Sequence, residues 1–169
     1  MIFNQISALF IQEDVELRLL RVRWRGGRNM QQFREAASQL VELAQQRGTL
    51  RMLLELNEQP DVPVYDQLWL STTLLPRAAK LPVRQLVVIL SGNRVYNRHV
   101  LESLLNQFQK QIQTDIQFFA QSDAALDWLT DNSPRVPELL TEWEQHGGNG
   151  PAGGNQAGLT TPTSRYLIP

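Results

Sequence analysis

Cysteine is absent from all 169 residues of the chain. This absence excludes disulfide bonds, thiolate metal ligands and cysteine nucleophiles, and it fits a reducing compartment. Long hydrophobic runs are also missing: the strongest, residues 86–90, is too short to span a bilayer. The first residues, Met1 to Gln5, lack the basic region and long apolar stretch of a signal peptide. We therefore expect a cytoplasmic protein without a membrane span.

An excess of charge of either sign is lacking as well. Sixteen Lys and Arg residues face 17 Asp and Glu residues, which leaves a formal net charge of −1. Proteins that bind nucleic acid usually carry a strong basic excess, so no nucleic-acid partner is expected. Apolar residues make up 42% of the chain, which is enough for the core of one ordinary domain.

The apolar pattern predicts five strands. Residues 6–11 form an apolar run that Gln12, Glu13 and Asp14 should end in a turn. Residues 17–24 alternate between apolar and arginine side chains, which predicts a half-buried strand antiparallel to the first. The runs 50–56, 86–90 and 115–119 are separated by helical patterns, which favours parallel pairing. The prediction is an α/β fold: a mostly parallel five-stranded sheet with an N-terminal antiparallel hairpin and helices packed on it.

Four helices are predicted between and after these strands. Three of them have expected N-terminal caps: Asn29 with Gln32 for the first, Asn97 for the third, and Ser122 or Asp123 for the fourth. Gly48 should end the first helix. The helix after Pro63 should place Leu68, Leu75 and Ala79 on one face, although its Ser and Thr residues weaken its propensity. The side chains expected in the core include Leu54, Val88, Leu104 and Phe118.

Composition divides the chain into three parts. Residues 1–133 hold the predicted α/β domain. Residues 134–146 form an amphipathic helix with Leu139, Leu140 and Trp143 on one face, which would dock on the domain or on a partner. Residues 147–169 are rich in Gly, Asn, Pro and Thr and should form a disordered tail whose removal leaves the fold intact.

The order of elements, together with four segments, resembles a known superfamily. The segments are Val22-Arg23-Trp24-Arg25-Gly26, Leu53-Leu54-Glu55-Leu56-Asn57, Gln85-Leu86-Val87-Val88-Ile89, and the stretch 119–129, which ends in Ala125-Leu126-Asp127-Trp128-Leu129. Residues 6–131 are similar to the STAS-like domains of anti-sigma-factor antagonists and sulphate transporters. The small stand-alone bacterial members, which are often grouped by fold with CRAL-TRIO lipid-transfer domains, look most similar. This resemblance implies a regulatory domain that binds protein.

Two departures from the family limit what the resemblance implies. Phosphoregulated members carry an Asp-Ser pair after the third strand, whereas residues 56–61 of this chain contain no hydroxyl group to accept a phosphate. Lipid-transfer domains of the related fold are longer and enclose a large apolar cavity, for which this chain has no extra elements. The expected function is therefore a non-catalytic protein-binding or regulatory module without the phosphate switch. The alternative is a small-ligand or lipid-binding domain with an apolar pocket between sheet and helices.

The candidate partner-binding residues follow the third strand. In the family this neighbourhood meets the regulatory partner, and here it holds Asn57, Glu58, Tyr65 and Trp69. Exposed aromatic side chains are frequent anchors of protein interfaces, and Trp69 lies off the Leu68 face of its helix. Packing of Trp69 against a neighbouring helix is the competing interpretation. The partner would be another protein or a second copy of the chain.

Arginines form the second candidate site. Arg21, Arg23, Arg25 and Arg28 could hold an anion, because guanidinium groups match the geometry of oxyanions. The competing interpretation is a solvated outer face of an edge strand, where charge prevents unwanted pairing. The glycine-containing segments 26–29 and 91–94 match no nucleotide-binding motif and are read as ordinary turns.

No group of residues in the sequence specifies a reaction. His99 and His146 have no metal-ligand spacing to carboxylates, and Ser71, Thr72 and Thr73 lie in no nucleophile motif. The acids near one strand end, Glu55, Glu58 and Asp61, are expected to be solvated. We expect neither enzymatic activity nor a cofactor nor a bound metal.

Overall fold

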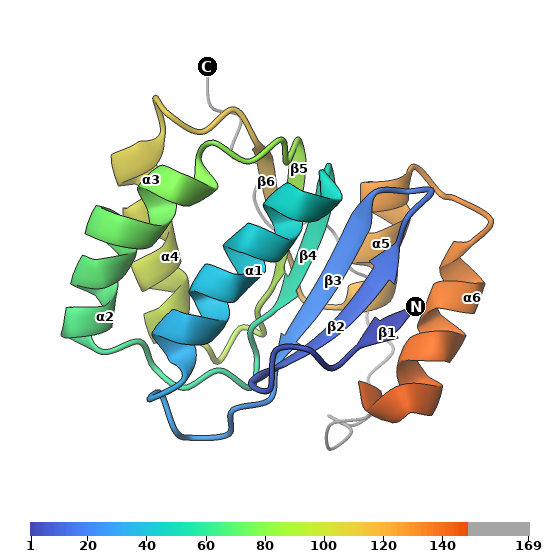
Figure 1. Ribbon diagram of the computed structural model, residues 1–169, viewed down its shortest axis with the longest axis horizontal. Helices are drawn as coiled ribbons and strands as arrows, with labels where there is room; N and C mark the ends of the chain where they lie inside the picture. Colours follow the sequence, from blue (N-terminus) through green and yellow to red (C-terminus); the bar gives the residue numbers. More distant parts are fainter. Residues whose placement is uncertain (149–169) are drawn as a thin grey trace.

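Six strands form one sheet in the order in which they occur along the chain (Figure 1). The computed structural model describes residues 1–148; the predicted disordered tail lies outside them except for its first two residues. The strands are β1 (Ile2–Phe3), β2 (Leu9–Asp14), β3 (Leu19–Trp24), β4 (Arg51–Glu55), β5 (Gln85–Ile89) and β6 (Asp115–Phe119). β1, β2 and β3 pair antiparallel, and β3 to β6 pair parallel. The predicted fold class is confirmed.

The sixth strand, β1, was not predicted. It has only two residues, which pair with Ile11 and Gln12 of β2. So short an apolar segment carries no periodic signal. Because β1 covers one side of β2 and β4 covers one side of β3, the hairpin lies inside the sheet rather than at its edge. The prediction of a solvated edge strand for residues 17–24 is therefore wrong.

Helices cover both faces of the sheet. α1 (Phe33–Arg47), α2 (Val64–Trp69), the π-helix η1 (Leu70–Leu74), α3 (Leu75–Ala78) and α4 (Val95–Phe108) lie within the connections between parallel strands. Buried residues of α1, η1 and α4 share one core with β2, β3 and β4. The parallel strands β3 to β6 follow one another in one direction across the sheet. When the connections between such strands have the same handedness, their helices lie on the same face of the sheet. α5 (Ser122–Thr130) and α6 (Val136–Trp143) pack with β3, β4 and β5 in a second core on the other face.

The predicted helix caps are mostly wrong. α1 begins at Phe33 without a side-chain cap, and the Oδ1 atom of Asn29 accepts a hydrogen bond from the backbone of Gln31 instead. Asn97 lies within α4, which begins at Val95, and α5 begins at Ser122 with Gln121 before it. Asn97 and Ser122 bond to groups distant in sequence, the loop around Val62 and the carboxylate of Glu55, whereas Asn29 and Asp123 bond the backbone of residues one or two positions after them. The predicted end of α1 at Gly48 is confirmed, because Gly48 has a left-handed φ of 56°.

The connection from β4 to β5 departs most from the predicted helix. We name residues 64–78, which comprise α2, η1 and α3, the arm. The π-helical turns of η1 have more residues per turn than an α-helix, so the positions before and after them no longer share the predicted face. Leu68 is 60% exposed rather than buried, whereas Leu70 and Leu74 point into the core.

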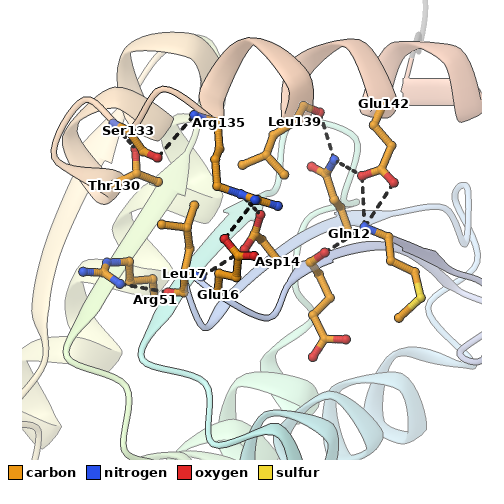
Figure 2. A network of polar contacts seen from close by, with 12 residues as sticks. Gln12, Asp14, Glu16, Leu17, Arg51, Thr130, Ser133, Arg135, Leu139 and Glu142 are labelled. Atoms are coloured by element: carbon orange, nitrogen blue, oxygen red, sulfur yellow. Dashed lines mark hydrogen bonds and ion pairs between the residues drawn. The ribbon is translucent and has the colours of Figure 1, made fainter.

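The C-terminal helix docks on the domain itself. Trp143 is almost fully buried against Phe10, with ring centroids 4.5 Å apart. Figure 2 shows the polar contacts beside it: Gln12 Nε2 donates to the carbonyl of Leu139 at 2.8 Å and to Glu142 at 2.6 Å. Arg135 pairs with Asp14 at 2.8 Å. The predicted turn at Gln12–Asp14 is wrong, because these residues continue the buried strand β2. Gln12 bonds to α6, Asp14 pairs with Arg135 just before α6, and Glu13 pairs with Arg47 of α1 at 3.7 Å.

No helix among residues 1–148 has the length and apolar character needed to cross a bilayer.

Candidate functional site

Exposed apolar side chains gather at one place in the described part of the chain. Seven large apolar residues of residues 1–148 are exposed, and five of them lie on α2 and at the start of α4. We call these five the apolar surface: Val64, Tyr65, Leu68, Val95 and Tyr96. Tyr65 is 81% exposed, the largest fraction of the five. Single exposed apolar residues are ordinary, but a group of them on adjacent elements is typical of an interaction site.

Hydrogen bonds join the two halves of the apolar surface. The hydroxyl of Tyr96 donates to the carbonyl of Val62 at 3.2 Å, and the Nε2 atom of Gln67 donates to that hydroxyl at 2.9 Å. Behind them, the buried Asn97 accepts from the backbone of Val62 at 3.0 Å and donates to the carbonyl of Pro60 at 3.0 Å. Asn97 thus fixes the loop that leads into α2, and the start of α4 holds α2 in position.

Trp69 lies at the inner border of the apolar surface. It is half-buried, and its ring meets the edge of Phe33 from α1 at a centroid distance of 6.2 Å. The guanidinium of Arg34 lies 5.6 Å from the Trp69 ring and also bonds Asp66 at 2.7 Å. Both interpretations of Trp69 therefore describe part of it: one portion packs on the neighbouring helix and the rest meets solvent.

The two other candidate partner-binding residues occupy the loop after β4. Asn57 and Glu58 are both exposed. The Oδ1 atom of Asn57 accepts a hydrogen bond from the backbone of Ser91 at 2.7 Å, which ties the ends of β4 and β5 together. Asn57 thus has a structural contact, and Tyr65 is the predicted residue that belongs fully to the apolar surface.

Two residues of the apolar surface besides Tyr65 could have been found from the sequence. Val64 and Leu68 are four residues apart, so they share a face of α2, and Tyr65 lies next to that face. Assigning Leu68 to the core concealed this face. Val95 and Tyr96 were missed because the helix was predicted to begin only after Asn97.

A cavity of about 250 Å³ lies between the sheet and the helices of the first face. It is lined by apolar side chains from β3, β4, β5, α1, α4 and the arm; the polar ones among the described residues are Gln59, Asn97 and Thr114. Leu54 was predicted to be buried but is only half-buried, and it lines this cavity. The other three predicted core residues, Val88, Leu104 and Phe118, are buried.

The arginine site is not the exposed stripe that the sequence suggested. Arg21 and Arg23 point to the face opposite Val22, as the alternation requires, but α6 covers this face. Arg21 is only 2% exposed. Arg25 and Arg28 are exposed, and the Arg25 guanidinium lies 5.5 Å from the ring of Phe10. The four arginines therefore do not converge on one anion site.

Glu55 lies at the centre of the buried arginines. Its Oε1 atom accepts from Arg21 at 2.6 and 2.8 Å and from Ser122 at 2.9 Å. Its Oε2 atom accepts from Arg23 at 2.5 and 2.6 Å. The ring of Trp143 lies over both guanidiniums, with centroid distances of 4.1 and 5.0 Å. We call these five residues the arginine cluster. The prediction that Glu55 is solvated is wrong.

The arginine cluster is a structural junction between β3, β4, α5 and α6. Burial lowers the pKa of Arg21 from its ordinary value, while the charge of Glu55 and its hydrogen bonds act in the opposite direction. Because one carboxylate is shared by two guanidiniums, Glu55 is fully occupied by its partners. Such an arrangement holds strands and helices in register rather than presenting a reactive acid.

The histidines and hydroxyl groups considered in the sequence as candidates for chemistry lie outside this cluster, whose one hydroxyl group is that of Ser122. No three His, Asp or Glu side chains among residues 1–148 form a metal site. His99 is 75% exposed and lies 3.9 Å from Glu102 on its own helix. The hydroxyls of Ser71 and Thr72 donate to the carbonyl of Leu68 in the preceding turn.

Comparison with known proteins yields no match: no family model, no curated protein sequence and no solved structure is similar to this chain.

Proposed function

We propose that this protein is a non-catalytic binding module that docks another protein on its apolar surface. The observation that carries the proposal is the gathering of Val64, Tyr65, Leu68, Val95 and Tyr96 on two adjacent elements, because an apolar group of this kind is typical of protein interfaces. Tyr65, its most exposed member, is one of the residue types most enriched among interface hot spots. The resemblance to STAS-like regulatory domains favours the same neighbourhood.

The positions of the five side chains support docking rather than packing within the fold. Tyr96 is held by hydrogen bonds from Gln67 and to Val62, so its ring is fixed before any partner binds. An aromatic side chain that is already held in place loses little conformational entropy on binding. The ion pair of Arg34 with Asp66, at 2.7 Å, lies beside the apolar side chains and provides a polar rim.

Charge substitutions on the apolar surface test the proposal. The double variant Tyr65→Asp/Leu68→Asp places two carboxylates on exposed positions and should leave the thermal midpoint within a few degrees of the wild type. The control is Val15→Asp, which alters an exposed apolar residue in the turn after β2. Tagged wild type and both variants are expressed in the native cell, and the proteins bound to each are quantified.

The expected result is a stoichiometric partner that wild type and Val15→Asp retain and that the double variant loses. Sedimentation of the purified chain, of mass 19.3 kDa, shows whether a second copy is that partner. Equal binding by all three proteins, or loss of binding by Val15→Asp as well, would show that the apolar surface is not the docking site.

A further inference from the structure

We propose that the cavity binds an uncharged apolar molecule of about ten non-hydrogen atoms, and that its occupancy orders the arm. The arm carries three of the five residues of the apolar surface, so the ligand would regulate docking. This second step rests on the proposed function, whereas ligand binding and ordering of the arm do not.

The lining of the cavity defines the class of ligand. No side chain that lines it within the described residues is charged. The amide of Asn97 is already bonded to the loop around Val62, and the hydroxyl of Thr114 donates to the carbonyl of Val83 at 2.8 Å. The third polar side chain, Gln59, is an uncharged amide, so a charged ligand would lose its hydration without gaining a counter-ion. An apolar cavity of about 150 Å³ holds benzene, so a cavity of 250 Å³ has room for a molecule of about two fused rings.

The arm depends on this cavity for its attachment. Leu70 and Leu74 are its buried side chains, and both line the cavity. α2 and α3 have six and four residues, lengths at which helices have little stability of their own. Side chains that face empty space forgo dispersion contacts on that side. A ligand would supply these contacts to Leu70 and Leu74.

The π-helix η1 connects the ligand to the apolar surface. Leu70 is the first residue of η1 and follows directly after α2, whose exposed face carries Tyr65 and Leu68. α2 contributes no buried residue of its own; the Trp69 ring and the ion pair of Asp66 with Arg34 anchor it to α1, and the hydrogen bond of Gln67 to Tyr96 anchors it to α4. The buried side chains nearest to α2 in the arm are those of η1, so we expect α2 to gain stability when η1 does, and π-helical turns are frequent at functional sites.

Naphthalene, which has ten carbon atoms, is the probe, and naphthalene-2-sulfonate is its charged control. Both are titrated into the full chain, and binding is followed by backbone amide NMR shifts and hydrogen exchange. At ten times the dissociation constant, naphthalene should slow exchange of the amides of residues 70–75, 77 and 78 about tenfold. The amides of α6 that exchange through local opening, on the other face of the sheet, should change less than twofold. Naphthalene-2-sulfonate should have no effect.

A variant that fills the cavity provides the second measurement. Leu86→Phe enlarges a half-buried side chain of β5 that lines the cavity, and Ala37→Leu does the same from α1 if Leu86→Phe fails to fold. Either variant should weaken naphthalene binding at least tenfold. Failure of naphthalene to bind, equal binding of the sulfonate, or binding that leaves the arm no better protected than α6 would overturn the inference. None of these results bears on docking, which the Tyr65→Asp/Leu68→Asp variant tests separately.

Discussion

Replacing Glu55 by glutamine should be among the most destabilising substitutions of a polar residue in this chain. Glu55 is 5% exposed and accepts hydrogen bonds from Arg21, Arg23 and Ser122. Glutamine keeps the shape but removes the charge, so two covered guanidiniums lose their common counter-ion. Removing one partner of a buried ion pair costs about 3–5 kcal/mol, because the remaining charge is left uncompensated.

The matched control is Glu42→Gln. Glu42 pairs with Arg77 at 3.2 Å, but both side chains are largely exposed. Ion pairs of this kind contribute about 0–1 kcal/mol. Arg21→Met provides an intermediate case, since it leaves Glu55 paired with Arg23 and should cost less than Glu55→Gln.

Urea denaturation measures all three variants. With a denaturant slope of about 2 kcal/mol per molar urea, Glu55→Gln should lower the midpoint by about 2 M, and Glu42→Gln by less than about 0.5 M. If Glu55→Gln lies within about 1 kcal/mol of Glu42→Gln, the arginine cluster is not the buried junction described above.

Three further predictions concern other parts of the fold. Gly26→Ala should cost about 1–3 kcal/mol in urea denaturation, because the new Cβ would lie 2.2 Å from the Trp24 ring. Leu54→Asp should lower the thermal midpoint strongly, since it places a carboxylate against the uncharged cavity. Glu142→Gln should cost about 0.5 kcal/mol at pH 7. Burial raises the pKa of Glu142, but hydrogen bonds from Gln12 and the amino terminus outweigh it and leave the pKa below its ordinary value. That stabilisation is present above the unfolded pKa, so the difference between wild type and variant should vanish as pH falls through the folded pKa.

The sheet could be predicted because its strands carry local signals. Residues 86–90 are a continuous apolar run, and residues 20–24 alternate strictly, so both strands and their pairing type follow from the sequence. The end of α1 followed from Gly48 for a similar reason: a left-handed residue is a local requirement.

The features that could not be predicted depend on partners distant in sequence. Gln12 and Arg21 look like surface residues, but Leu139 and Trp143, more than 100 residues away in the chain, cover them. The apolar surface was only partly predicted, because a regular helix would place Leu68 on one face with Leu75 and Ala79, and the π-helix η1 lies between them. The cavity is a property of how side chains of the sheet and several helices pack, which periodicity does not describe.

Photo-crosslinking in the native cell is a direct test of docking on the apolar surface. A benzophenone amino acid replaces Tyr65 in one variant, Leu68 in a second and Val15 in a control, all of which are exposed. We expect one discrete protein adduct from positions 65 and 68 and none of that mass from position 15. If the variant at position 65 gives no adduct, or if the variant at position 15 gives the same adducts, the apolar surface does not dock a protein.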